Sequence, residues 1–384
     1  MKRRHGFFRK IFIFVIILIP GMLPGEESSG IVFKKANEFR LKKNYTMELK
    51  YLKKAAALKP DSHYIKGRIA QNIYVYQKKF IEAIPWYEAS YPKGKRPAWI
   101  LRQAAGAYLW AGHYYFGLGK WKRAEKYFRK AAEAAEEGNF PHEKYVFFAA
   151  ACRTRRAMGR IKPDYIHKIQ IVFVKKTDVR LVDGVKMHIR GALTERQKKR
   201  ALIGARSMKS LWEVMSGGKL SAEIRVLEWN GAIKKLRVEE TGAAGKKRRW
   251  RLEEKSLCAD LSPVLIKTIG DTDTYCFIWS SREFNIANAG SWTYYLEKGK
   301  KVHRGFVQIP SERLLINAPF LFIHEFFHVL ENTGGIRPRH GFSEKNKRLF
   351  PGYKGSHELE YYQWHFRTTF PKLKKGWKGV SFIR

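Results

Sequence analysis

Apolar residues recur at helical spacing through residues 31–160, in a pattern that repeats. A short polar turn that contains lysine and ends on an aromatic residue occurs at residues 43–45, 78–80 and 119–121. Alanine, leucine and aromatic positions follow each turn at the spacing of one helix face. Leu49 and Ala83 are 34 residues apart, and Ala83 and Ala124 are 41 apart. The pattern predicts helix–turn–helix units, with seven additional residues in the loop around residues 92–95 and a closing helix over residues 143–158.

The pattern changes after residues 162–164. Runs rich in β-branched and aromatic residues follow at 168–174, 222–229, 274–279 and 306–309, and they predict strands. One helix is predicted among them, over residues 194–216. Thr194 and Gln197 form a capping box at its start, an apolar stripe runs along it, and Gly217 follows its end. Together with the helical positions near the end of the chain, this order predicts an α+β domain over residues 165–384.

The first 25 residues have the pattern of an export signal. Five basic residues precede an almost unbroken apolar run over residues 11–23, and Glu26 and Glu27 follow it. Such a helix is too short to cross the roughly 30 Å apolar core of a bilayer, whereas it suits the centre of a signal peptide. We therefore expect an exported protein (periplasmic, at the cell surface or secreted) with cleavage near Gly25. An uncleaved segment that anchors the chain in the membrane is the alternative.

The charge balance changes which partners are expected. Lys and Arg number 76 against 34 Asp and Glu, a net charge of +42. Such a surface attracts polyanions, and behind an export signal an anionic surface polymer is a better candidate than a specific nucleic acid. The basic segments 246–251 and 372–378 are accordingly expected to be solvated loops. The hydrophobic content of 45% excludes a disordered chain, and three cysteines exclude a disulfide scaffold. Cys258 and Cys276 are interpreted either as one bridge or as two buried thiols.

The residues that indicate chemistry lie at 324–328, in the sequence His-Glu-Phe-Phe-His. On a helix, positions i and i+4 project from the same face, so the imidazoles of His324 and His328 can meet one metal ion. The Glu325 carboxylate lies beside them and can take a proton from water. Zinc suits nitrogen ligands, and a catalytic zinc site lowers the pKa of water toward about 7.

The surroundings of these residues favour a buried site. Across residues 320–332, the polar side chains fall within one arc of about 120° and apolar side chains cover the rest of the helix. Burying two imidazoles and a carboxylate without partners is costly, and a metal ion satisfies them together. The alternative is a polar stripe that merely faces solvent.

Two resemblances follow from these residues. Residues 320–332 resemble the active-site helix of the zincin metallopeptidases. Residues 31–160 resemble tetratricopeptide repeats, the third unit best, although a generic helical bundle is an alternative. The resemblances imply an all-α tetratricopeptide-like solenoid followed by a zincin-like α+β domain with Zn²⁺ as cofactor. They also imply a peptide or protein substrate laid along an edge strand, for which residues 306–309 are the candidate. A concave repeat surface would bind a protein partner or the substrate.

The third zinc ligand is left open by the sequence. Metzincins have Gly three residues and His six residues after the second His, where this chain has Glu331 and Gly334. Aspzincins use an Asp, but no Asp follows Asp273. His340, brought back by the turn after the helix, is the favoured ligand. Glu358 on a following helix is the alternative, and His357 is a further one.

The sequence also suggests roles for Glu331 and Tyr362 near the metal. Glu331 lies about 10 Å along the helix axis from His324, so we expect it to support the site and not to bind zinc. Tyr362, or its neighbour Tyr361, is the candidate hydrogen-bond donor to the oxyanion of the tetrahedral intermediate. The alternative for either tyrosine is packing in the core.

The sequence supports a main hypothesis and competing ones. The main hypothesis is an exported zinc metallopeptidase in which Glu325 is the general base. The alternatives are a non-catalytic repeat adaptor with a structural metal site, and a basic surface that binds polyanions.

Overall fold

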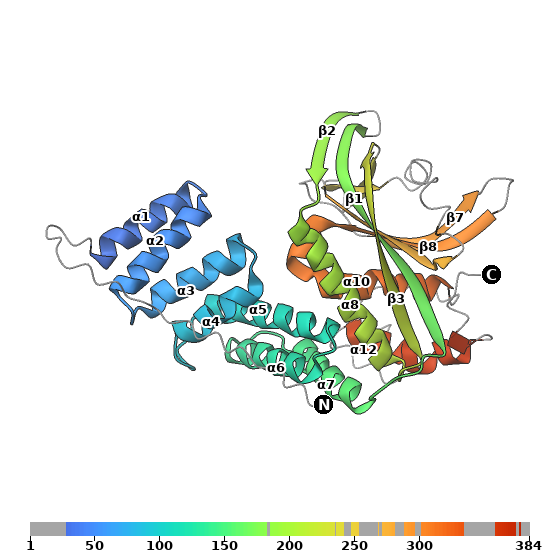
Figure 1. The fold of residues 1–384 in the computed structure, drawn as a ribbon, viewed down its shortest axis with the longest axis horizontal. Coiled ribbons are helices and arrows are strands. Elements are labelled where there is room, and N and C mark those ends of the chain that lie inside the picture. The colour runs from blue at the N-terminus through green and yellow to red at the C-terminus, as the bar shows by residue number, and fades with distance from the viewer. Residues whose placement is uncertain are drawn as a thin grey trace, which may run out of the picture.

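The computed structural model describes residues 28–182, 185–234, 236–241, 247–252, 268, 271–280, 288–295, 301–333, 358–373 and 376–377. The chain combines a helical first half with a second half of helices around a mixed sheet, so the predicted mixture of helices and strands is confirmed (Figure 1). The export signal predicted at residues 1–25 lies outside the described residues. Within the described part of the chain, no helix is long and apolar enough to cross a membrane.

The first half consists of helices that pair as antiparallel hairpins. They are α1 (Ser29–Leu41), α2 (Tyr45–Leu58), α3 (His63–Gln71), η1 (Asn72–Tyr76), α4 (Phe80–Ser90), α5 (Ala98–Gly117), α6 (Trp121–Glu137) and α7 (Glu143–Ala157).

The same turn joins the helices of each predicted unit. The first of its three residues is left-handed each time, with φ of 56° at Lys43, 56° at Lys78 and 72° at Gly119. An aromatic residue then begins the next helix: Tyr45, Phe80 or Trp121. The helix–turn–helix units predicted from these positions are therefore confirmed, as is the closing helix α7.

The placement of the seven additional residues was predicted wrongly. The loop between α4 and α5 covers residues 91–97, against residues 59–62 for the loop between α2 and α3, so it holds only part of the excess. The larger part lies in α5, which has 20 residues where α3 and η1 together cover residues 63–76. A glycine permits this long helix to pack closely, because a Cβ on Gly112 would lie 2.6 Å from the Phe128 ring of α6.

The second half begins with two paired strands and a helix, then continues with strands before its final helices. Its elements are β1 (Tyr165–Val182), β2 (Val185–Ala192), α8 (Glu195–Met215), β3 (Leu220–Ile233), β4 (Leu236–Thr241), β5 (Lys247–Leu252), β6 (Thr274–Trp279), β7 (Asn288–Tyr295), β8 (Lys301–Pro310), α10 (Ser311–Thr333), α12 (Glu358–Thr368) and η5 (Phe370–Lys372). The strands predicted from the apolar runs are confirmed. The capping box of α8 is also present, with the Thr194 amide 2.7 Å from Gln197 Oε1.

The sheet is parallel at its centre, and antiparallel pairs, β4–β5 and β7–β8, stand at the two ends of the strand order. β1 pairs with β3 on one side and β6 on the other, and β8 pairs with β6, all in parallel. β7 runs antiparallel to β8 and is the last described strand on that side. Residues 306–309 lie in β8, between β6 and β7, so the prediction that they form the edge strand is wrong. The strand in the edge position is β7.

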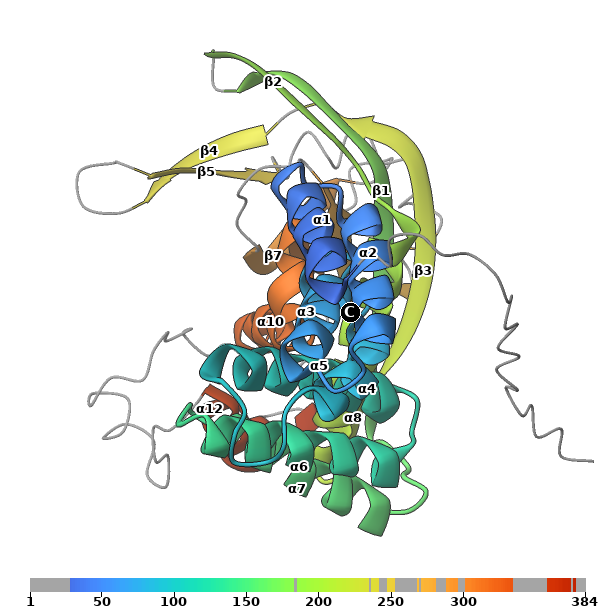
Figure 2. The same ribbon diagram turned by 90° about the vertical axis from the view of Figure 1, so that its left-hand side faces the viewer.

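The alternation of side chains along the strands separates two cores. Cys276 and Ile278 of β6 pack toward α8 and α10, together with Val307 and Ile309 of β8. Tyr275, Phe277 and Trp279 point to the opposite face, where they pack with Phe306 and with residues of the β1–β2 and β4–β5 pairs. Figure 2 shows the helices gathered on one side of the sheet while these two strand pairs extend away from it.

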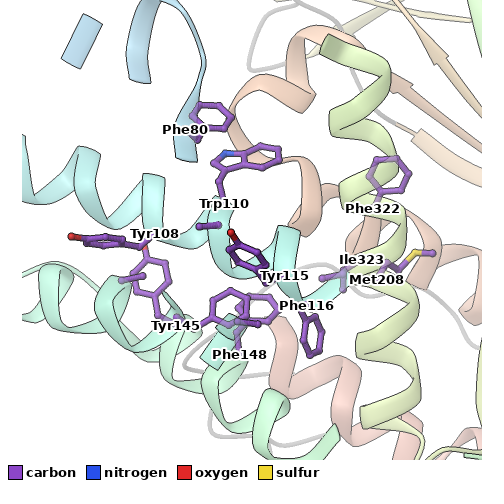
Figure 3. Packing of buried hydrophobic residues seen from close by; sticks show 14 of the residues in the cluster. Phe80, Tyr108, Trp110, Tyr115, Phe116, Tyr145, Phe148, Met208, Phe322 and Ile323 are labelled. Carbon is purple, nitrogen blue, oxygen red and sulfur yellow. The ribbon is translucent and has the colours of Figure 1, made fainter. Parts of the chain in front are cut away.

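Helix α8 joins the two halves of the molecule. Figure 3 shows aromatic side chains of the first half, among them Trp110 and Phe116, near Met208 of α8 and Ile323 of α10. A Cβ on Gly117 would lie 2.9 Å from the Cβ of Arg206, so α5 and α8 are in close contact. Hydrogen bonds occur along α8: Arg196 donates to the Gln77 carbonyl, Arg200 to the Lys78 carbonyl (2.7 Å), Ser210 to the Phe116 carbonyl (3.3 Å) and Arg155 to Glu213 (2.9 Å).

Candidate metal centre

Residues 320–332 of helix α10 are buried along most of their surface, as the sequence predicts. Its apolar residues pack against the sheet, α8 and α12, and those that are at most 1% exposed are Phe322, Ile323, Phe326, Phe327, Val329 and Leu330. The polar arc remains: His324 and His328 are half-buried, while Glu325 and Glu331 are buried. The helix therefore holds two imidazoles and two carboxylates at the border of the core.

The two imidazoles face each other across one turn of α10. Their Nε2 atoms are 3.3 Å apart, and the ring planes are at 84°. Each ring is held from its other nitrogen: His324 Nδ1 lies 2.8 Å from the Tyr362 hydroxyl, and His328 Nδ1 lies 2.8 Å from Glu331 Oε2. Because Nδ1 and Nε2 lie on opposite sides of an imidazole, these partners direct both Nε2 atoms toward one point.

The contact with Glu331 favours one tautomer of His328. An ionised carboxylate only accepts hydrogen bonds, so the hydrogen between the two groups belongs to His328 Nδ1. Nε2 of the neutral ring then presents its lone pair, the form in which histidine binds metals. Glu331 is 0% exposed and also accepts a hydrogen bond of 2.7 Å from the Tyr361 hydroxyl through Oε1. The expectation that Glu331 supports the site, and does not itself bind the metal, agrees with this geometry.

Helix α12 is positioned by its packing on Phe327. The Phe327 ring lies 4.3 Å from that of Tyr362 and 6.0 Å from that of Phe366, measured between ring centroids. His365 packs on the same ring, and its Nδ1 is 3.0 Å from the Thr369 hydroxyl. Burial lowers the pKa of His365 to about 4, which keeps this imidazole neutral. The contacts place the tyrosines of α12 directly behind the facing histidines.

Glu325 points toward the sheet side of the helix and is 6% exposed. Burial raises the pKa of the Cys276 thiol on β6 well above its usual value, and the charge of Glu325 raises it further. Cys276 is a free thiol, so the interpretation of Cys258 and Cys276 as a bridge is not supported, and Cys258 itself lies outside the described residues. Glu325 thus occupies a secluded position near Cys276 of β6, where few solvent molecules compete for its carboxylate.

The donor set fits zinc as far as it is described. Two nitrogen ligands at roughly 2.0–2.1 Å from one zinc ion, at the tetrahedral angle, lie about 3.3–3.4 Å apart. The observed separation of 3.3 Å between Nε2 atoms agrees with that spacing. The described residues include no group of three or more His, Cys, Asp or Glu side chains that could hold a metal. His340 and His357 lie outside the described residues, and so does the side chain of Glu358, whose backbone begins α12.

Tyr362 is close to the site, but not where an oxyanion donor is expected. Its hydroxyl contacts His324 Nδ1, behind the ring, whereas a reacting carbonyl would lie on the Nε2 side. Sequence reasoning missed this contact because the tyrosine pair alone does not show how α12 crosses α10. The hydrogen bond between Glu331 and His328 could have been predicted from the sequence, since residues three apart are neighbours on a helix.

The comparisons with known proteins add no family to this description. No protein-family model matches the chain, and no curated protein matches it, so the candidate metal centre is argued from its own geometry.

Proposed function

We propose that this chain is a zinc-dependent hydrolase that cleaves peptide bonds, with His324 and His328 as zinc ligands and Glu325 as the general base. The observation that carries the proposal is the pair of Nε2 atoms 3.3 Å apart, each ring being held at Nδ1 by a separate partner. With both Nδ1–H groups directed to Tyr362 and Glu331, the two Nε2 lone pairs would face one point, and a divalent cation placed there would satisfy both.

The chain's own residues divide the chemistry between them. Zinc, when bound, supplies Lewis acidity, which lowers the pKa of water toward about 7. The Glu325 carboxylate accepts the proton that water loses as it attacks the peptide carbonyl, and it then passes this proton to the amine that leaves. Its burial excludes bulk water, which strengthens its interaction with charge that develops in the reaction.

For the third ligand we propose His340, which the sequence favours, with Glu358 as the alternative. The side chains of both lie outside the described residues, and the backbone of Glu358 begins α12. His340→Ala should lose zinc while Glu358→Ala retains it, and the reverse result would assign Glu358.

We assign Tyr362 and Glu331 to positioning. Each contacts the Nδ1 of one proposed ligand, so each fixes the orientation of a ring without contacting the reacting atoms. Such partners of metal-bound histidines commonly change metal affinity by 10–100-fold when they are removed.

The family assignments belong to the same proposal. Repeated hairpins with a shared turn support a tetratricopeptide-like first half, which would bind a protein partner or the substrate. A sheet with an antiparallel edge strand, β7, followed by the helix of the two histidines supports a zincin-like second half. Export follows from the sequence of residues 1–25 alone.

The decisive experiment is Glu325→Gln in the full chain. We expect zinc to be retained while hydrolysis of a quenched peptide library falls by about 10²–10⁴-fold. Glu136→Gln, at an exposed position of α6, is the matched control and should keep full activity. His324→Ala and His328→Ala should lose both zinc and activity. Unchanged hydrolysis in Glu325→Gln would reject the proposed mechanism, and retention of zinc in both histidine variants would reject the metal centre.

A further inference from the structure

A strongly basic surface lies on α6 and α7, outside the candidate metal centre. On α6 its residues are spaced i, i+4 and i+7, and two on α7 are spaced i and i+3, so each set follows one side of its helix, while Arg160 lies in the bend after α7. All of them are exposed. The α6–α7 basic face consists of Lys122, Lys126, Arg129, Arg153, Arg156 and Arg160.

Three of these arginines converge on one carboxylate. Glu125 accepts hydrogen bonds from Arg129 (2.8 Å), Arg153 (3.2 Å) and Arg156 (3.3 Å). Glu125 is 8% exposed, whereas the three arginine side chains are 58%, 46% and 49% exposed. The carboxylate therefore fixes the guanidinium groups from below and leaves much of each group facing solvent.

The charges of this face do not balance. Glu125 carries one negative charge beneath three guanidinium groups, and the remaining acidic residues of α6 lie beyond Arg129, toward its carboxyl end. Holding like charges together costs free energy that an anionic ligand would recover. Guanidinium groups fit phosphate particularly well, because their parallel N–H groups match two phosphate oxygens.

The face is directed away from the rest of the molecule. Arg155, between Arg153 and Arg156 in sequence, turns the other way and donates to Glu213 of α8 at 2.9 Å. Figure 1 shows α6 and α7 at the lower edge of the helical half. The basic residues extend along two neighbouring helices and do not surround a pocket, which suits a broad surface better than a small anion.

We propose that the α6–α7 basic face docks the protein on a membrane surface through the phosphates of anionic phospholipids. Val146, 49% exposed and two turns before Arg153 on the same side of α7, adds an apolar side chain to the face. Where the apolar run at residues 11–23 stays attached as the uncleaved anchor, it supplies one weak membrane contact and the polybasic face supplies the second. After cleavage, membrane binding would depend on the charges of the face. This proposal is independent of the zinc site.

The test compares charge variants of the full chain on two kinds of vesicle. Lys122→Gln, Lys126→Gln and Arg160→Gln are combined in one variant whose residues do not contact Glu125, so its folding should be unaffected. We expect the extra affinity for phosphatidylcholine vesicles that contain phosphatidylglycerol, over pure phosphatidylcholine, to fall about a hundredfold, at roughly fivefold per charge. Arg129→Gln, Arg153→Gln and Arg156→Gln together should give at least the same loss.

A control variant with the same charge change separates this face from the overall charge. Lys34→Gln, Lys50→Gln and Lys53→Gln remove three exposed charges from α1 and α2, and we expect a loss of less than about threefold. An equal loss in the control would overturn the proposal, because it would show that net charge alone drives binding. Soluble polyphosphate is the second probe: variants that lose polyphosphate binding but keep vesicle binding would assign the face to a soluble phosphate polymer and reject the membrane.

Discussion

Each half of the molecule contains a polar cluster around one buried glutamate, and the two clusters differ in the contacts that surround the carboxylate. In the helical half, Glu48 is 0% exposed, and each of its carboxylate oxygens accepts a hydrogen bond from a side chain, from Arg68 (2.9 Å) and from Asn72 (2.8 Å). In the second half, Glu331 is equally buried, but its partner His328 directs Nε2 toward the same atom of His324. Both carboxylates have partners for their two oxygens, but the second cluster also places two imidazole nitrogens 3.3 Å apart, facing each other. That difference distinguishes a structural polar cluster from a candidate ligand site.

The largest expected effect is a loss of stability when the Glu48 cluster is disrupted. Glu48→Ala leaves the Arg68 charge buried without its carboxylate, and we expect the free energy of unfolding to fall by about 3–5 kcal/mol. Urea unfolding followed by circular dichroism measures it. Glu38→Ala, at an exposed position of α1, is the control and should change stability by less than about 0.5 kcal/mol. A small effect of Glu48→Ala would remove the contrast on which the comparison rests.

A third buried polar contact, between the two halves, should respond to pH. His113 is 1% exposed, and its Nδ1 is 2.8 Å from the Ser207 hydroxyl of α8. Burial lowers the pKa of His113 to about 3 from 6.5, so below pH 6.5 the unfolded chain binds a proton that the folded chain does not. Stability therefore falls as the pH drops through this window, by about 2 kcal/mol at pH 5 from this group.

His113→Gln should remove that part of the pH dependence. Unfolding free energies of the two proteins, measured from pH 7 to pH 5, should converge as the pH falls, because only the parent protein loses the contribution of His113. The other buried histidines titrate in both proteins and give both the same slope. His63→Gln, at an exposed position, should leave the pH dependence unchanged. Parallel curves for His113→Gln and the parent protein would contradict the assignment.

Substitution in the Glu331 cluster should change the affinity for zinc and not the free energy of unfolding. In Glu331→Gln the amide oxygen can still accept one hydrogen bond, but the charge that supports His328 is lost. We expect zinc affinity, measured by competition with a chelator, to fall about 10–100-fold while urea unfolding of the metal-free protein changes little. Unchanged zinc affinity together with a large loss of stability would make this cluster structural, like that of Glu48.

The smallest expected effect is that of Tyr362→Phe. The ring remains packed on Phe327 and only the hydrogen bond to His324 is lost, so zinc affinity should fall by less than about tenfold. Hydrolysis should fall in proportion to the zinc lost. A fall of more than a hundredfold with full zinc occupancy would instead support the role of oxyanion donor that the sequence suggests.

The sequence predicted local features far better than relations between distant segments. The capping box at Thr194, the turns at Lys43 and Lys78 and the buried helix around His324 depend on residues a few positions apart, and all are present. The edge strand was misassigned because β7, which includes Asn288 and Gly290, lacks the apolar alternation by which strands are recognised. The function of Tyr362 depends on how α12 crosses α10, which spacing along the chain does not determine.

The docking of the helical half on α8 could not have been predicted from side-chain patterns. Arg196, Arg200 and Ser210 of α8 donate to backbone carbonyls of the first half. Every residue carries a carbonyl, so the sequence does not indicate which of them will be used. The apolar stripe of α8 predicted a buried helix, but not that two different partners would cover it.

This placement of α8 has a consequence for how such a protein can change over generations. A gene rearrangement that replaced the repeats with another array would leave Arg200 and Ser207 facing surfaces that do not match them. Exchange between related chains would therefore need to carry the matching side of α8 with it, and a nick by a protease near residue 160 should yield two fragments that migrate together. The contacts along α8 therefore favour inheritance of the repeats and the sheet together.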